Sequence, residues 1–480
     1  MPGTGAKTTA SIDTRVGLLS ERANLNIRNL LSCLRRGSAA ELMNGIGLCT
    51  AVILVVLSVT STSMSQTGIS EQNSTATSRT MQQQVALLAE DRSVHDAFEW
   101  FNSQRRTLSD LQLEVTAIPA PPFGEGHRAE WAKKKFQELG LKQVEVDGEG
   151  NVLGVRPGTE EGAKYLALSA HLDTVFPSGT KLNVGRDGEK LRGPGISDNS
   201  AGITALLAIA EAMHKTGLKT KAPIVFVANV GEEGEGNLRG MRHIFSDAKW
   251  KNAIEYTVVL DGGGTDSIVA QGLGSRRFLV TINGPGGHSW SDFGTPNPVV
   301  VLARVIDRFN RTSVPANPKT TFNVGSISGG TSVNAIPETA SMKVDVRSSS
   351  PVEIDRVERS LRASLSQAMA EFSSLPDGKA LLTCSVKLIG DRPAAELPQN
   401  ARILQAVRAV DAQLHIQTRM QRASTDANIP LSMGREALTL GAGGTGGGAH
   451  TLHEWYDPTN RELGLKRILL SVLMLAGLSQ

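Results

Sequence analysis

The sequence predicts an α/β protein whose sheet is mostly parallel and flanked by helices. The first observation is a globular composition: 480 residues with 40% hydrophobic and 20% charged types, enough chain for two domains or more. The second is an alternation of apolar, strand-like runs with helical periodicity beyond about residue 86. The third is that several of these runs end on histidine or carboxylate side chains, at the sheet edge where open parallel sheets bind ligands.

The N-terminal segment has the pattern of an export signal. Arg35 and Arg36 precede a strongly apolar run, residues 46–59, and small residues follow it. The run is short for a membrane span of about 20 residues, so an uncleaved anchor and a buried helix are the weaker alternatives. We expect residues 1–75 to form a leader and the protein to be exported, periplasmic or secreted. The segment before the run is long for a signal, so a true start at a downstream methionine such as Met43, which keeps the run, is an alternative. If the leader itself is a misassigned start, we expect the protein to be cytoplasmic.

Four predicted strands lead to side chains of the kinds that bind metals. They are residues 165–170, which lead to His171 and Asp173; 224–230, which lead to Glu232 and Glu233; 256–260, which lead to Asp261; and 437–440, which open a glycine loop that reaches His450. Because the carboxyl ends of parallel strands meet at one edge, we expect these side chains to lie close together. An isolated Glu-Glu pair is more commonly a solvated turn, but this pair follows a buried apolar run.

Asp198 stands just before a predicted helix, residues 201–214, whose apolar positions form one stripe. Gly217 fits a C-terminal stop for that helix. Taken alone, Asp198 is best explained as an ordinary N-terminal cap, because Asp is preferred at that position. Taken with the strand ends, it is one more candidate metal ligand.

Two histidines, three single carboxylates and a Glu-Glu pair are more ligands than one metal ion needs. A mixed shell of imidazole and carboxylate suits two Zn²⁺-like ions with one carboxylate between them. Such a pair can hold and acidify a water, and a neighbouring carboxylate can take the proton. Glu232 and Glu233 are placed to divide those tasks, one as a base and the other as a ligand.

Two other function classes have weak support. Lys and Arg number 50 against 47 Asp and Glu, a net charge of +3 without a concentrated basic face, so a nucleic-acid partner is not expected. Residues 441–446 formally match the dinucleotide-binding pattern G-x-G-x-x-G, but no predicted helix follows them. A dinucleotide-binding oxidoreductase is therefore only a remote alternative.

The residues resemble a family of zinc-dependent amidohydrolases and peptidases, peptidase family M20. It includes peptidase T, carboxypeptidase G, acetylornithine deacetylase and succinyl-diaminopimelate desuccinylase. Seven segments carry the resemblance in the family's order: SAHLDTVFP, GPGISDNSAG, NVGEEGEGNLRG, VVLDGGG, INGPGGHSW, GGTSVNAIPETASMKVDVRSS and GAHTLHEW. They cover nearly all of the chain beyond the leader.

The resemblance implies a site with two Zn²⁺ ions, for which Co²⁺ or Mn²⁺ are possible substitutes. Asp198 would bridge the ions, and the remaining ligands would be His171 and Asp261 on one ion and Glu233 and His450 on the other. Asp173 would orient His171. Glu232 would be the general base for a metal-bound hydroxide and would later protonate the leaving amine. His450 is preferred over His453 because it stands four residues before Glu454, as the family's ligand histidine does before a Glu.

The resemblance also implies a smaller α+β (βαββαβ) lid and dimerisation domain inserted into a discontinuous catalytic domain. We expect residues 275–390 to form the lid, and residues 76–274 and 391–480 to form the two parts of the catalytic domain. His288 resembles the lid histidine that reaches across a homodimer to the scissile carbonyl, and Asn334 and Arg347 resemble residues that hold the substrate. The alternatives are purely structural roles: a loop histidine, a turn asparagine and an edge-strand arginine.

The expected activity is cleavage of amide bonds in small substrates. Within the family, Asp at the position of Asp261 tends to accompany aminopeptidases and dipeptidases, so an exopeptidase acting on short peptides is the first hypothesis. An N-acyl amino acid deacylase is the alternative. A catalytically inactive member is disfavoured because every expected ligand and the base are present. Membrane contact is expected only through the N-terminal anchor, if that segment is retained.

Overall fold

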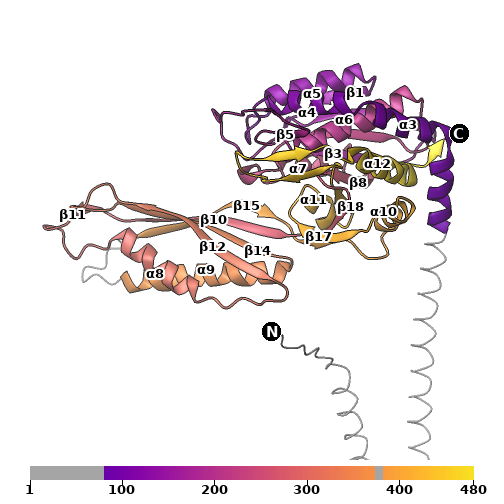
Figure 1. Ribbon diagram of the computed structural model, residues 1–480. Helices are drawn as coiled ribbons and strands as arrows, with labels where there is room; N and C mark the ends of the chain where they lie inside the picture. The colour runs from indigo at the N-terminus through magenta and orange to yellow at the C-terminus, as the bar shows by residue number, and fades with distance from the viewer. Residues whose placement is uncertain (1–79, 373–381, 480) are drawn as a thin grey trace, which may run out of the picture. The chain divides into compact units, whose positions relative to one another are not determined.

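The computed structural model describes residues 80–372 and 382–479, which belong to one compact unit, Ser78–Gln480 (Figure 1). The predicted leader lies outside the described residues. Among those that are described, no helix has both the length and the apolar character needed to cross a membrane.

A nine-stranded sheet forms the centre of the larger domain. Its order is β1-β2-β7-β3-β8-β18-β9-β16, with β17 also paired to β9. The central strands β7, β3, β8 and β18 run parallel, whereas β1, β2, β9 and β16 add antiparallel pairs at the two sides. The bounds are β1 Lys142–Val146, β2 Val152–Arg156, β3 Tyr165–His171, β7 Ile224–Asn229, β8 Ile254–Leu260, β9 Ser267–Gly272, β16 Ala395–Glu396, β17 Arg419–Ala423 and β18 Glu436–Leu440.

Helices cover both faces of this sheet because the central strands are apolar on both sides; every residue of β7 is buried. One face packs, through the largest hydrophobic cluster, against the helical residues 80–90 and a set of six further helices, and the other packs against a second set of two helices through a smaller cluster. The first set is α3 Arg92–Ser103, α4 Arg105–Thr116, α5 Gly126–Glu138, α6 Ser200–Lys215, α10 Arg402–Gln413 and α12 Arg461–Ala476. The second set is α7 Arg239–Ser246 and α11 Asn428–Ser432.

A second domain is inserted between β9 and β16 and has a hydrophobic core of its own. Its four-stranded antiparallel sheet has the order β12-β14-β10-β15, and α8 and α9 lie along one face of it (Figure 1). The bounds are β10 Gly274–Asn283, β11 Gly287–His288, α8 Pro298–Asn310, β12 Thr320–Gly329, β13 Ala335–Ile336, β14 Thr339–Ser348, α9 Pro351–Phe372 and β15 Thr383–Arg392. The predicted fold class, a helix-flanked α/β domain interrupted by a βαββαβ domain, is confirmed.

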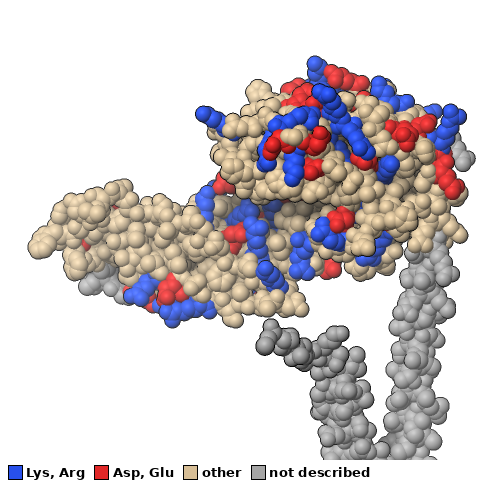
Figure 2. All heavy atoms as spheres, in the orientation of Figure 1, with Lys and Arg blue, Asp and Glu red and all other residues tan. Residues whose placement is uncertain are grey.

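Charged side chains of both signs are interspersed on the face of the molecule seen in Figure 2. The end of the inserted domain that carries β11 shows few of them there. Three large hydrophobic side chains around that end are strongly exposed: Trp290 at 87%, Phe293 at 91% and Val333 at 103%. An exposed apolar patch of this kind is typical of an interaction surface.

Two small sheets join distant parts of the chain near the central sheet. The first has the order β19-β20-β5-β4 and brings the segment after β18 beside the segment before α6. The second pairs the C-terminal β21 with β6. Their bounds are β4 Gly185–Asp187, β5 Lys190–Arg192, β6 Lys219–Thr220, β19 Thr445–Gly447, β20 Trp455–Asp457 and β21 Leu478–Ser479.

Candidate metal centre

The structure brings the five predicted ligands together at the carboxyl ends of the parallel strands. The His171 Nε2 atom lies 3.2 Å from Asp198 Oδ1 and 3.6 Å from Asp261 Oδ1. The His450 Nε2 atom lies 3.0 Å from Glu233 Oε1 and 3.2 Å from Asp198 Oδ2. The two oxygens of Asp198 thus face two different ligand groups, each with its atoms within 4.8 Å of one another. A third group joins His171 with Glu232 and Glu233, and His453, the alternative to His450, belongs to none of the three.

The tautomer of His171 follows from its surroundings. Its Nδ1 atom lies 3.0 Å from the Asp173 carbonyl oxygen, which can only accept, so Nδ1 carries the proton. In the neutral ring the Nε2 lone pair then faces the carboxylates of Asp198 and Asp261. Burial lowers the pKa of His171, but the nearby carboxylates of Asp173, Asp198 and Asp261 outweigh it and hold that pKa well above its ordinary value. A cation, either a proton or a metal ion, is required between these groups.

Asp173 holds the site in a way that differs from the prediction. Its carboxylate lies 3.6 Å from His171 Nδ1, too far for a good hydrogen bond, and it is the backbone carbonyl that orients the ring. The carboxylate instead accepts the backbone N–H groups of Glu232 at 3.0 Å and Glu233 at 2.7 Å. Asp173 therefore fixes the loop that carries the Glu-Glu pair. The physical reason is that two adjacent N–H groups match the two oxygens of one buried carboxylate.

Asn199, and not Asp198, is the N-terminal cap of α6. The Asn199 Oδ1 atom accepts from Gly202 N at 3.0 Å, and its Nδ2 atom donates to the Leu260 carbonyl at the end of β8, at 2.8 Å. The capping explanation of Asp198 is therefore wrong. The side chain of Asp198 is left to face the two histidines; burial acts to raise its pKa, but the two histidines outweigh burial and lower it.

Glu454 anchors the loop that carries Asp198. Its carboxylate accepts three backbone N–H groups, those of Gly195, Ser197 and Asp198, each at 2.8 Å. The side chain is buried, and burial raises its pKa to about 7 against the opposing effect of these hydrogen bonds. The sequence marked Glu454 only as the landmark for His450, so its anchoring contacts were not predicted.

Glu232 has a partner that sequence reasoning missed. Arg392, the last residue of β15, places its Nη1 atom 3.0 Å from Glu232 Oε1, and its Nη2 atom also contacts the Glu232 carbonyl. The two side chains are only 7% and 6% exposed. Burial raises the pKa of Glu232 well above its ordinary value, although Arg392 opposes that change. No local signal marks Arg392, because the pair joins segments 160 residues apart.

Sequence reasoning also missed Asp426, a buried carboxylate near the site. It lies in the loop between β17 and α11, and its Oδ2 atom accepts from Asn229 Nδ2 at 2.6 Å. Burial raises the pKa of Asp426 to about 7, and the charges of His171 and Asp173 act on it as well. Asn229 is the last residue of β7. The search for polar side chains at strand ends therefore finds Asn229, which is neutral, but not its charged partner Asp426.

The three predicted substrate-binding residues lie in the inserted domain, outside the ligand groups. His288 in β11 pairs with Ala335 in β13, and the backbone of Asn334 accepts from Ser289 N at 3.0 Å, so His288 and Asn334 are neighbours. Arg347 lies near the other end of β14, opposite Ser275 of β10, and its Nε atom pairs with Asp345 at 2.6 Å. The structure thus separates Arg347 from the other two along the strand.

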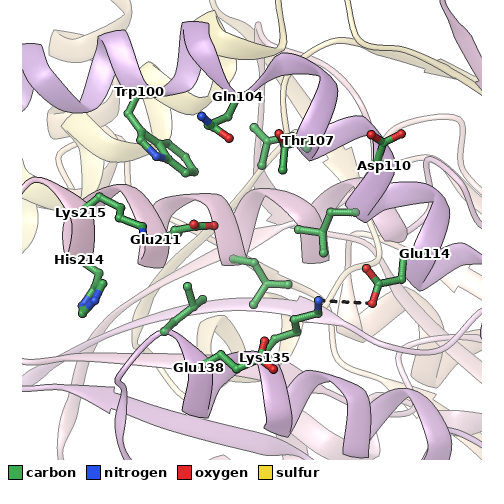
Figure 3. Close-up of a pocket in the computed structure, with 14 residues that line it drawn as sticks. Trp100, Gln104, Thr107, Asp110, Glu114, Lys135, Glu138, Glu211, His214 and Lys215 are labelled. Atoms are coloured by element: carbon green, nitrogen blue, oxygen red, sulfur yellow. Dashed lines mark ion pairs between the residues drawn. The ribbon is translucent and has the colours of Figure 1, made fainter.

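Two features elsewhere do not belong to this site. A cavity of about 410 Å³ lies between α3, α4, α5 and α6 (Figure 3), with an ion pair of 3.3 Å between Lys135 and Glu114 at its edge. None of the residues that line it is a predicted ligand. The glycine run 441–446 leads into strand β19 and not into a helix, so it lacks the helix N-terminus that binds a dinucleotide phosphate.

A helix-flanked α/β domain that gathers histidines and carboxylates at its parallel strand ends is typical of a metal-dependent hydrolase. Residues 167–473 match the model of "Peptidase family M20/M25/M40", and the chain belongs to this family of metallopeptidases.

Curated relatives are distant. The protein YqjE of Bacillus subtilis (strain 168), which has no assigned function, is 22% identical over 355 residues, 71% of this chain and 91% of YqjE. Carboxypeptidase G2 of Pseudomonas sp. (strain RS-16) is 25% identical over 241 residues, 48% of this chain and 55% of that enzyme. The chain therefore aligns with about half the length of carboxypeptidase G2.

Solved structures share the fold. The aminopeptidase PepT of Bacillus cereus superposes with a TM-score of 0.62 at 17% identity, covering 78% of this chain and 99% of PepT. The Bacillus subtilis protein YXEP, described as a dinuclear metal-binding peptidase of the M20 family, gives a TM-score of 0.58 at 16% identity, covering 78% of this chain and 99% of YXEP. At these identities the likeness establishes the fold alone.

Proposed function

We propose that this metallopeptidase is a dinuclear zinc exopeptidase that acts on short peptides. The observation that carries the proposal is the position of Asp198, whose two oxygens face His171 on one side and His450 on the other. A carboxylate shared by two ligand groups suits a pair of ions more than a single one.

The donor set fits two divalent ions. His171 Nε2 and Asp198 Oδ1 are buried without a hydrogen-bond partner, which is costly for polar atoms unless a cation lies between them. His171 and Asp261 would hold one ion, Glu233 and His450 the other, and Asp198 both. Imidazole with carboxylate is a usual zinc shell, and Co²⁺ or Mn²⁺ accept similar donors.

Bound ions of this kind polarise the scissile carbonyl and acidify the attacking water. Side chains of this protein carry out the proton transfers and position the base. Glu232 accepts the proton of the water and later donates it to the departing amine nitrogen. Asp173 keeps the backbone of Glu232 in place, and Arg392 holds one of its carboxylate oxygens.

The preference for peptides rests on family resemblance. Asp261 is the residue type that accompanies aminopeptidases and dipeptidases, and PepT, which shares the fold, is described as an aminopeptidase. Arg347, whose guanidinium can grip a carboxylate with two hydrogen bonds, would hold a substrate carboxyl group. An N-acyl amino acid deacylase uses the same chemistry and remains the alternative.

The working form would be a homodimer. His288 and Asn334 lie together at the end of the inserted domain that also exposes Trp290, Phe293 and Val333. Burying this apolar end against a second copy would remove it from water and would bring His288 to that copy's substrate. The predicted leader supports a proposal of export, which detection of the mature protein in a periplasmic or secreted fraction would test.

A substrate panel tests the proposed activity. The purified residues 76–480, supplied with zinc, would be incubated with di- and tripeptides and, in parallel, with N-acetyl and N-succinyl amino acids. Release of single amino acids from peptides supports the exopeptidase and shows which end is trimmed. Cleavage of the acyl amino acids alone would move the assignment to a deacylase. The matched control is the Glu232→Gln variant, which should be inactive on both sets.

A further inference from the structure

A hollow beside the loops that carry Asp173 and Glu233 has mainly apolar walls. It has a volume of about 540 Å³, and Pro121, Pro122, Phe123, Val175 and Pro177 line it. Gly234 also lines it and directly follows Glu233, while Val175 lies two residues beyond Asp173. The hollow therefore adjoins the loops that carry the candidate ligands.

Phe123 is the most unusual residue of this hollow. Its side chain is 65% exposed, and its backbone has a φ of 67°, in the left-handed region that non-glycine residues rarely adopt. The Arg239 guanidinium lies 4.8 Å from the ring centroid, and Arg239 is itself held by Glu125 at 2.8 Å and Glu149 at 3.0 Å. An exposed aromatic ring in a strained backbone conformation is a feature that concentrates at functional sites.

The loop that carries Phe123 is fixed to the core at both ends. Thr174 N donates to the Ala120 carbonyl at 2.8 Å, and the buried Arg128 donates through Nε to the Ile118 carbonyl at 3.0 Å. Glu125, three percent exposed, continues the anchoring through Arg239. Phe123 is therefore held in position by a rigid support, and a contact with its ring needs no loop rearrangement.

The walls define the chemistry of an occupant. Glu235 is the one charged residue that lines the hollow, and it is already paired with Lys343 Nζ at 2.9 Å. Proline, valine and phenylalanine walls favour an uncharged, apolar group, and a ring backed by a guanidinium offers a flat surface for packing.

We propose that this hollow is the subsite for an apolar side chain of the peptide substrate, which packs against Phe123. The inference rests on the proposed peptidase function, because continuity with the ligand loops is what places a substrate there. It extends that function by naming the substrate class: short peptides with a leucine-like or phenylalanine-like residue next to the cleaved bond.

The test compares the wild type with Phe123→Ala and Phe123→Leu. Both variants, like the wild type, place a non-glycine residue at a backbone position with positive φ. Leu87→Ala is the matched control, because Leu87 is a similarly exposed hydrophobic residue, at 68%, outside the hollow. The probes are the dipeptides Ala-Xaa and Xaa-Ala, with Gly, Leu, Phe or Glu as Xaa. At one of the two positions we expect kcat/KM of the wild type to be at least about tenfold higher for Leu or Phe than for Gly or Glu.

In Phe123→Ala this preference should fall by about tenfold, mainly through KM, while the glycine peptide is cleaved as by the wild type. Phe123→Leu should be intermediate and Leu87→Ala unchanged. An equal loss for glycine and leucine peptides would overturn the subsite while leaving the peptidase intact, and so would a wild type without an apolar preference.

A binding measurement separates failure of the subsite from failure of the proposed function. Calorimetry would compare L-leucine with glycine on the zinc-loaded wild type and on Phe123→Ala. Tighter leucine binding that Phe123→Ala weakens supports the subsite even if no peptide of the panel is cleaved. Equal binding of the two amino acids, or no effect of the substitution, would contradict it.

Discussion

The backbone N–H of Asp198 donates to the carboxylate of Glu454 at 2.8 Å, across 256 residues of sequence. Glu454 also accepts from Gly195 and Ser197, so one buried side chain fixes the backbone on which the shared carboxylate stands. The position of Asp198 between His171 and His450 therefore depends on a residue whose carboxylate, in the described part of the chain, hydrogen-bonds neither histidine.

Replacing Glu454 should weaken metal binding. Glu454→Gln turns one acceptor oxygen into an NH₂ donor facing backbone N–H groups, so the Asp198 loop loses part of its anchor. Changes of this kind cost metal sites about 10- to 100-fold in affinity. We expect zinc titrations monitored by calorimetry to show that loss, and the visible spectrum of the cobalt form to change. Glu138→Gln, on an exposed face of α5, is the control; equal zinc affinity in both variants would exclude the anchoring role.

The two adjacent glutamates should respond differently to the same substitution. Glu232→Gln removes a proton acceptor but no ligand, so kcat should fall by about 10² to 10⁴ while zinc content stays near that of the wild type. Glu233→Gln removes a ligand and should lower zinc content together with activity. Elemental analysis and steady-state kinetics on the same samples check both expectations. Substantial activity in Glu232→Gln would show that another group is the base.

Removing Arg392 alone should destabilise the protein more than removing both Arg392 and the charge of Glu232. Arg392→Met leaves a buried carboxylate without its partner, a change that typically costs about 3 to 5 kcal/mol. The double variant Arg392→Met/Glu232→Gln removes the uncompensated charge and should recover part of that loss. Urea unfolding of the wild type, the two single variants and the double variant measures the difference. A double variant as unstable as the sum of the two single variants would mean that the two side chains do not interact.

The metal-free protein should lose stability as the pH rises above neutrality. Hydrogen bonds to Asp198 and Glu233 raise the pKa of His450 from 6.5 to about 10. Because the folded state binds this proton more tightly than the unfolded chain, the contribution to stability is complete below about pH 6.5 and disappears as the pH approaches 10. The free energy of unfolding in a chelator should therefore fall less steeply over this range in His450→Gln than in the wild type.

Bound zinc should change the way that the free energy of unfolding depends on pH. Metal binding requires the neutral imidazole and releases its proton, so the apparent zinc affinity should rise with pH over the same range. Proton release on zinc binding, followed in buffers of different ionisation enthalpy, measures it directly. Identical pH slopes in wild type and His450→Gln would show that the histidine is not coupled to Asp198 and Glu233.

Local pattern was enough to locate the elements that carry the candidate site. The apolar run at residues 165–170 became β3, Tyr165–His171, and the helix expected at 201–214 became α6, Ser200–Lys215. Both elements are buried over most of their length, and their apolar pattern is the dominant signal. The antiparallel edge strands β1 and β16 were not expected, because short, half-exposed strands have a weak pattern.

Contacts made across large sequence distances could not be predicted in the same way. Arg392 and Asp426 have no local sequence pattern that points to the site, and only the folded chain brings them to Glu232 and Asn229. The choice between Asp198 and Asn199 as the cap of α6 also depended on the tertiary structure, since the side chain of Asn199 is fixed by the Leu260 carbonyl.

The central claim is that Asp198 is shared by two metal ions. The most direct measurement is the zinc content per chain of the wild type and of Asp198→Asn, equilibrated with buffered zinc, together with peptide hydrolysis at each zinc level. The account predicts two zinc ions per wild-type chain, activity that rises with occupancy of the second ion, and a clear loss of both in Asp198→Asn. A single zinc ion per active wild-type chain, or no zinc at all, would contradict it.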